Sequence, residues 1–196
     1  MTPHLFCLVA QSDDLALLPA LADAGVDGFQ VRDKSLATGA LVTLTRAVID
    51  VVRPSGAQVV VNDRLDVALA AGADGIHLGT DDLAVADARR LAPSLLVGAT
   101  CRTRAEVVAA AAAGADYAGF GPVFATDSKP GLPAPLGLSA VTAAAGVLPL
   151  IVIGGLSAAT AAEARAAGAH GVAVIGGIWR HPDPVTAAKE LVAAVG

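Results

Sequence analysis

The chain has 196 residues, 55% of them hydrophobic, and a formal net charge of -5 at pH 7. This length is enough to bury one sizeable core but is short for two, so we predict a single catalytic domain over residues 1–196. The acidic balance and the lack of a Lys/Arg cluster argue against nucleic-acid binding, and the apolar runs are too short to span a membrane.

Short runs rich in β-branched and other apolar residues recur along the whole chain, each about the length of a buried strand. We predict eight strands from them: Leu5–Ala10, Gly28–Arg32, Gln58–Asn62, Gly75–Leu78, Leu95–Ala99, Tyr117–Gly121, Leu150–Ile153 and Gly171–Ile175.

Alanine- and leucine-rich segments of helical length separate these strands, among them 13–24, 103–113 and 157–167. Thr103 and Ser157 are placed to cap two of these helices at the N-terminus. Four turns of similar sequence follow helices, at residues 24–28, 71–75, 113–117 and 167–171. The second residue of each turn is a glycine, which suits the position just after a helix.

Alternation of strands and helices predicts a parallel sheet, and eight such units with short connections predict an α/β single-domain (β/α)8 TIM barrel. An open, doubly wound sheet is the structural alternative. In a barrel the chemistry lies at the carboxyl ends of the strands, so polar residues at the predicted strand ends become the candidate site.

The second predicted strand runs into Gln30, Arg32 and Lys34. If the strand persists, its alternation places these three side chains on one side, with two cations directed together. An ordinary solvated strand end is the alternative.

Acidic residues follow the next two predicted strands, Asp63 after the third and Asp81 and Asp82 after the fourth. Carboxylates on adjacent strand ends can share Mg²⁺, which completes its shell with water and phosphate oxygens. The alternative is that Asp81 or Asp82 caps the helix expected to begin near Leu83.

The connection after the sixth strand, residues 121–131, is too long for a tight turn. Thr126, Ser128 and Lys129 make it a candidate anion-binding segment, with a polar loop of no special chemistry as the alternative. Glycine pairs at 154–155 and 176–177 follow the last two strands, where backbone N–H groups can approach a phosphate.

The remaining candidate residues point to no further chemistry. His77 lies within the fourth predicted strand and is expected to be a core or rim residue rather than a base. Cys7 and Cys101 form no CxxC pair, so we expect reduced thiols and neither a disulfide scaffold nor a zinc site. The first residues lack the pattern of a secretory signal, which favours a cytoplasmic location.

The motifs resemble the thiamine phosphate synthase and TenI family in order and spacing over nearly the whole chain. They are QVRDK at 30–34, VNDRLDVALAAGADGIHLG at 61–79, DD at 81–82, GFGPVFATDSKPG at 119–131, VIGGL at 152–156 and GVAVIGGI at 171–178.

The resemblance implies a Mg²⁺-dependent transferase that couples hydroxymethylpyrimidine diphosphate with thiazole phosphate, giving thiamine phosphate and pyrophosphate. It implies that Mg²⁺ is held by Asp63 and Asp82. It also implies substrate contacts, which fall on the pyrimidine diphosphate side at Gln30, Arg32, Lys34, Asn62 and Lys129 and on the thiazole phosphate side at Thr126, Ser128, Gly155, Ile175 and Gly176. Arg32, Lys34 and Lys129 are the expected catalytic residues, whose positive charge would stabilise the departing pyrophosphate, and Thr100 is a further expected substrate-binding residue.

Three positions bear on which activity the resemblance implies. Thr80 stands where the synthases usually have Gln, and a Gly-x-Ser-x-His stretch is replaced by 98–102, which keeps a hydroxyl at Thr100 but ends in Arg102. In TenI-like thiazole tautomerases, a histidine follows the strand-six glycine, and here that residue is Pro122. The retained Asp63 and Asp82 also favour the synthase.

Two other functions stay open beside the synthase, a TenI-like tautomerase and a noncatalytic barrel that binds phosphorylated ligands. The sequence leaves open whether the chain forms a homo-oligomer and whether residues 122–131 act as a lid.

Overall fold

The computed structural model describes residues 1–127, 131 and 133–196. Eight parallel strands close into a barrel in the order β1 to β8, each paired with its neighbours in sequence and β8 paired with β1. The strands are β1 Leu5–Val9, β2 Gly28–Val31, β3 Gln58–Asn62, β4 Gly75–Leu78, β5 Leu96–Cys101, β6 Tyr117–Phe120, β7 Leu150–Ile153 and β8 Gly171–Val174. The predicted (β/α)8 barrel is therefore confirmed, and the open sheet is wrong.

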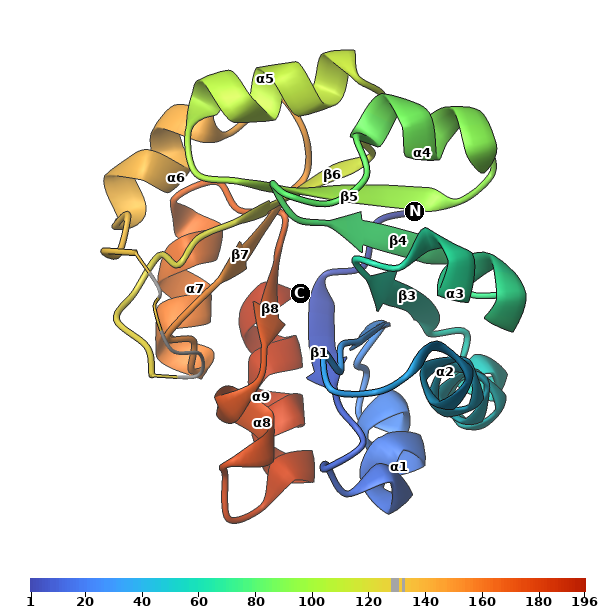
Figure 1. Ribbon diagram of the computed structural model, residues 1–196. Helices are drawn as coiled ribbons and strands as arrows, with labels where there is room; N and C mark the ends of the chain where they lie inside the picture. Colours follow the sequence, from blue (N-terminus) through green and yellow to red (C-terminus); the bar gives the residue numbers. More distant parts are fainter. Residues whose placement is uncertain (128–130, 132) are drawn as a thin grey trace.

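Helices surround the barrel as an outer ring (Figure 1). They are α1 Leu18–Asp23, α2 Thr38–Val52, α3 Leu65–Ala71, α4 Val85–Leu91, α5 Arg104–Ala112, α6 Leu138–Ala144, α7 Ala158–Ala166, α8 Gly176–Trp179 and α9 Pro184–Val195. Within the described residues, no helix is long and apolar enough to cross a membrane.

Strand alternation divides the apolar residues between two layers. Side chains such as Phe29, Val61 and Val172 face outward and pack with the helices in the largest core cluster. Phe6, Tyr117 and Ile151 belong to a smaller cluster that fills the barrel interior. The interior is a packed core below the carboxyl ends of the strands, and this core forms the floor for any site above it.

The predicted helix caps are present. Thr103 and Ser157 each accept a hydrogen bond from the backbone N–H three residues on and complete a capping box. The glycines of the four repeated turns, Gly25, Gly72, Gly114 and Gly168, all have positive φ, which ends each helix and starts the next strand at once.

The aspartates of these repeated turns serve the opposite end of the barrel from the candidate site. Asp27 accepts from the N–H groups of His4 and Leu5, while Asp74 accepts from that of Val59. Each carboxylate thus accepts a hydrogen bond from a backbone N–H group near the start of a neighbouring strand. The repeated motif stabilises the amino-terminal face of the barrel and carries no chemistry.

Asp116 is the third such aspartate and allows a direct test. Its Oδ2 accepts from the N–H of the buried Val97 at 2.7 Å and also pairs with Arg89. We expect Asp116→Ala to lower the free energy of unfolding by about 2 kcal/mol, because it removes the acceptor of a buried donor. Urea denaturation measures the loss.

Asp87→Ala is the matched control, since Asp87 is exposed and pairs only on the surface with Arg90. Its expected cost is below about 0.5 kcal/mol. Equal losses in the two variants would contradict the role assigned to Asp116.

Candidate active site

A cavity of about 440 Å³ lies at the mouth of the barrel, where the carboxyl ends of the strands meet. Its walls combine apolar side chains, such as Phe6, Ile151 and Ile153, with a few inward polar groups and the backbone of the glycine pairs. This volume and this mixture of apolar walls and few polar groups are typical of a small-molecule site.

Most of the predicted substrate-binding residues line this cavity. They are Gln30, Asn62, Thr100, Thr126, Gly155, Ile175 and Gly176. They come from six different strand ends or the connections after them, so the barrel brings together residues up to 146 positions apart. Ser128 and Lys129 lie outside the described residues, and their assignment stays a prediction.

The cavity also contains a polar network that the sequence did not predict as part of the site. The Nδ1 of His77 lies 3.2 Å from the Oη of Tyr117, and its Nε2 lies 3.1 Å from the Oγ1 of Thr100. All three residues line the cavity. Burial raises the pKa of the Tyr117 hydroxyl, which keeps the phenol neutral.

Two glycines make room for this network. A Cβ at Gly98 would lie 2.1 Å from Cζ of Tyr117, and a Cβ at Gly119 would lie 2.6 Å from Cε1 of His77. Both rings therefore lie directly against neighbouring strands. Alternation placed His77 and Tyr117 on the inward faces of their strands, and that was the available signal for their role.

The acidic pair forms at adjacent strand ends, as predicted. Asp63 is the middle residue of a tight turn in which the N–H of Arg64 donates to the carbonyl of Asn62 at 2.8 Å. Its φ of 66° is the only positive value among the described residues other than glycine. Such strained backbone collects at functional sites, and here it accompanies a carboxylate that contacts Asp82.

The two carboxyl groups lie close enough to shift each other's pKa in opposite directions. Burial and the neighbouring Asp63 raise the pKa of Asp82. Burial acts the same way on Asp63, but the hydrogen bond to Asp82 and the charges of Lys34 and Arg32 outweigh it, so the pKa of Asp63 is lowered. A cation bound between the two carboxylates would relieve their mutual repulsion.

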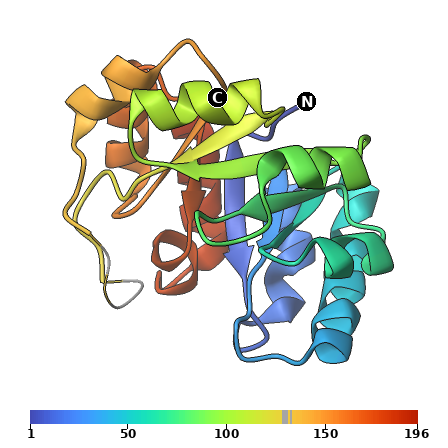
Figure 2. The same ribbon diagram turned by 45° about the horizontal axis from the view of Figure 1, so that its top comes forward.

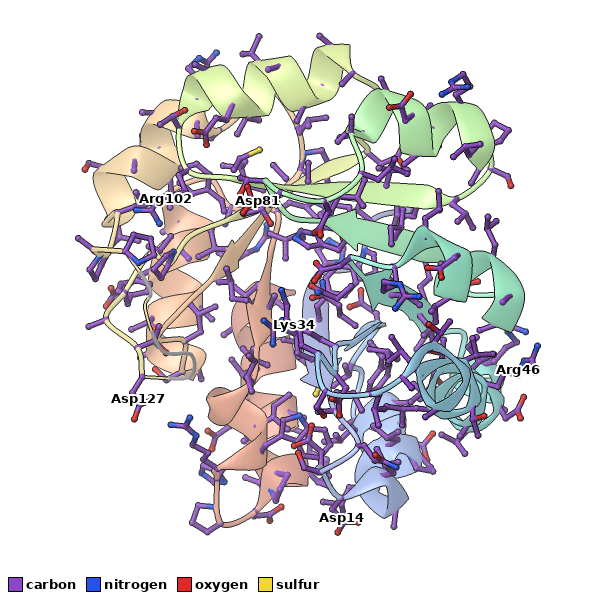
Figure 3. The ribbon with its side chains drawn as sticks, viewed as in Figure 1. Asp14, Lys34, Arg46, Asp81, Arg102 and Asp127 are labelled. Atoms are coloured by element: carbon purple, nitrogen blue, oxygen red, sulfur yellow. The ribbon has the colours of Figure 1, made fainter. Side chains whose placement is uncertain are left out.

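Arg32 and Lys34 lie beside the acidic pair, though not by the predicted route. The strand β2 ends at Val31, so alternation does not reach them. They line one shallow hollow together, and Nζ of Lys34 lies 3.0 Å from Oδ2 of Asp63. Figure 3 shows Lys34 near the middle of the ring of elements, whereas Arg46 lies at its outer edge.

The helix-capping alternative for the acidic residues is wrong. Helix α4 begins at Val85, and its N-cap residue Ala84 makes no side-chain cap. Asp82 instead accepts from the N–H of Gly79 at 2.7 Å, which holds its carboxylate toward Asp63. The described residues contain no group of three or more His, Cys, Asp or Glu side chains that could hold a metal by themselves.

Comparison with known proteins identifies the family. A family model described as thiamine monophosphate synthase matches residues 3–178. The chain belongs to the thiamine monophosphate synthase family.

Relatives and a solved structure of this family align over most of the chain. Thiamine-phosphate synthase of Methanoculleus marisnigri is 47% identical over 181 residues, covering 91% of this chain and 85% of the relative. The structure of thiamine phosphate pyrophosphorylase from Pyrococcus furiosus has a TM-score of 0.89 at 29% identity, covering 98% of this chain and 95% of that one.

One relative is longer. The thiamine biosynthesis bifunctional protein ThiM/ThiE of Symbiobacterium thermophilum is 46% identical over 190 residues, which are 95% of this chain but 40% of that protein. The chain thus spans less than half of the bifunctional relative.

Arg102, a departure from the synthase pattern, does not line the cavity. Its Nη1 donates to the carbonyl of Gly121 at 2.9 Å and its Nη2 to that of Ala134 at 3.0 Å. The guanidinium therefore ties together the two ends of the connection between β6 and α6, and Figure 3 shows it on that side of the molecule. The cavity is therefore not filled by this arginine.

We expect Arg102→Ala to increase the rate of proteolytic cleavage between residues 122 and 136, because a single side chain joins both ends of that connection. Limited proteolysis with mass detection measures this rate. Arg104→Ala is the matched control, since Arg104 also donates to two carbonyls, those of Ala143 and Ala145, but beyond this connection. Equal acceleration in both variants would contradict the assignment.

The glycine pair after β7 allows a backbone conformation and a close chain approach that a larger residue would prevent, whether or not a ligand is bound. Gly155 has a φ of 66°, and a Cβ there would lie 2.4 Å from the carbonyl oxygen of Ala125. Any larger residue at this position would displace the connection after β6. Its predicted role in phosphate binding is consistent with its place on the cavity wall and stays a prediction.

Proposed function

We propose that the chain is a thiamine phosphate synthase. It would couple hydroxymethylpyrimidine diphosphate with thiazole phosphate, releasing pyrophosphate. One observation carries this proposal: a cavity of about 440 Å³ has two glycine pairs on its β7–β8 side, and its opposite side is formed by the ends of β2 to β4, which continue into Lys34, Asp63 and Asp82 just outside the lining. Two phosphorylated substrates can thus be held by opposite sides of one mouth.

The residues present fit Mg²⁺. Asp63 and Asp82 contact each other from adjacent strand ends, and oxygen ligands are those that this ion prefers. Two carboxylates leave positions for water and diphosphate oxygens, as is usual for Mg²⁺ in phosphate sites. When bound, the ion would supply positive charge for the departing pyrophosphate.

The chemistry requires no protein nucleophile. The C–O bond between the pyrimidine methylene and the diphosphate breaks, the electron pair leaves with pyrophosphate, and the ring stabilises the carbon cation. The thiazole nitrogen then forms the new C–N bond. Arg32 and Lys34 would stabilise the charge on the leaving group, and Lys129 would do so from the connection after β6.

The cavity walls serve the second step. Gln30 and Asn62 would orient the pyrimidine side, since both are inward polar residues that line the cavity. Apolar side chains such as Ile151 and Leu156 would keep water from the cation, while the shared cavity holds the two reacting atoms together.

A TenI-like tautomerase has less support. Its histidine after the strand-six glycine is absent here, and Pro122, joined to Gly121 by a cis peptide bond, lines the cavity in its place. The proton transfer that defines a tautomerase lacks that base.

The test is incubation with both substrates and Mg²⁺, followed by mass detection of thiamine phosphate. Formation of product only when all three are present supports the synthase. Isomerisation of the thiazole carboxylate would support the tautomerase, and binding without product would support a noncatalytic barrel. A cytoplasmic location and a homo-oligomer stay predictions.

A further inference from the structure

The cavity carries an arginine that the family motifs quoted above leave without a role. Arg180 lines the cavity just after α8, and among the described residues of the lining it is the only Arg or Lys. Arg32 and Lys34 line the separate hollow near β2. The glycine side of the cavity therefore has its own cation, on a different element from those near the acidic pair.

Arg180 lies against the backbone at Gly176. A Cβ built on Gly176 would lie 3.2 Å from Cδ and 3.3 Å from Nε of Arg180. The neighbouring wall is formed by Gly154, Gly155 and Gly177, which expose backbone rather than side chains. An anion that approaches this backbone meets the guanidinium at the same place.

The local structure holds Arg180 in this position. The Nε1 of Trp179 donates to the carbonyl of Leu8 at 2.6 Å, which ties α8 to the end of β1. The preceding Ile178 is fully buried, and the N–H of Arg180 donates to the carbonyl of Gly176 at 3.1 Å. The backbone at Arg180 is therefore fixed, while its guanidinium is exposed enough to exchange one anionic group for another.

The guanidinium contacts an acidic residue across the mouth. Its Nη1 donates to Oδ1 of Asp127 at 2.7 Å, and the two side chains are 56% and 87% exposed. Figure 2 shows the β6–α6 connection and α8 extending beyond the same ends of the strands. An ion pair this exposed contributes little stability, so a phosphate can compete for the arginine.

We propose that Arg180 binds the phosphate of the thiazole substrate and that this phosphate displaces Asp127 from the guanidinium beside the glycine pairs. The geometry favours the monophosphate over the diphosphate because the acidic pair and Lys34 lie on the β2–β4 side. A guanidinium has several N–H donors in a planar fork, which suits a phosphate bound in bidentate fashion. This inference rests on the proposed function.

The test compares steady-state kinetics of the parent, Arg180→Gln and Asp127→Asn. Arg180→Gln is expected to raise KM for thiazole phosphate by about tenfold to a hundredfold, with KM for the pyrimidine diphosphate within about twofold. With the thiazole alcohol, which lacks the phosphate, the parent and Arg180→Gln should bind with equal affinity. Asp127→Asn should lower KM for thiazole phosphate, because it removes the competing carboxylate.

Arg90→Gln is the matched control, an exposed arginine that pairs with Asp87 on α4 and does not line the cavity. If Arg180 only ties the β6–α6 connection in place, Arg180→Gln and Asp127→Asn will raise KM for both substrates alike, and the inference fails. It also fails if Arg180→Gln leaves KM for thiazole phosphate unchanged while the parent turns over.

Calorimetry with thiazole phosphate alone separates this inference from the proposed function. Binding to the parent that is at least about tenfold weaker in Arg180→Gln would support the phosphate role even if the parent formed no thiamine phosphate. Equal binding in the two proteins would overturn that role and leave the synthase proposal intact.

Discussion

Replacing Asp63 or Asp82 by asparagine is expected to lower kcat/KM by about a hundredfold or more, the largest loss of activity among the variants considered. Each substitution removes one of two carboxylates that would hold Mg²⁺ between adjacent strand ends. Asparagine is the appropriate replacement because Asp63 has a φ of 66°, which asparagine adopts more readily than alanine.

Activity measured over a range of Mg²⁺ concentrations distinguishes loss of the ion from loss of the fold. A variant with a weakened ion site should regain part of its activity at high Mg²⁺ and keep the parent's unfolding midpoint in urea. Asp81→Asn is the matched control, an exposed neighbour of Asp82 that should stay within about twofold of the parent. Undiminished turnover in excess EDTA would overturn the metal assignment.

The barrel itself could be predicted because its signals are local and repeated. Eight apolar runs, the capping residues Thr103 and Ser157, and a glycine within each repeated turn all follow from backbone preferences. Once eight parallel strands close into a barrel in sequence order, their carboxyl ends necessarily meet at one face. Gln30 was predicted for this reason, while Asn62 and Thr100 came from the resemblance and also lie at or near strand ends.

The contacts that depend on side-chain direction were harder to predict. The sequence does not show that β2 ends at Val31, and so the route by which Lys34 reaches Asp63 differs from the expected alternation. Arg102 occupies a motif position yet turns away to two carbonyls of the next connection. His77 was predicted to be a core or rim residue rather than a base, but the sequence does not show its contact with Tyr117, 40 positions away.

The second large effect is expected on stability, from Gly98→Ala. A methyl group on β5 would lie 2.1 Å from Cζ and 2.4 Å from Oη of Tyr117, a side chain that is almost fully buried. We expect the free energy of unfolding to fall by about 2–4 kcal/mol, because overpacking of a filled interior forces side chains and backbone to shift. Urea denaturation measures the loss, and KM for both substrates reports the displacement of the Tyr117–His77–Thr100 network.

Two further variants show whether the ring of Tyr117 causes this loss. Gly39→Ala is the matched control, because a Cβ on that α2 glycine would meet nothing within 4 Å. It should lose no stability and gain up to about 1 kcal/mol, since alanine restricts the unfolded chain. Tyr117→Leu removes the ring, so the double variant should be more stable than the sum of the two single losses predicts, by about 1 kcal/mol or more. Strict additivity would mean that the methyl group meets no resistance from Tyr117, and the packing argument for Gly98 would then be wrong.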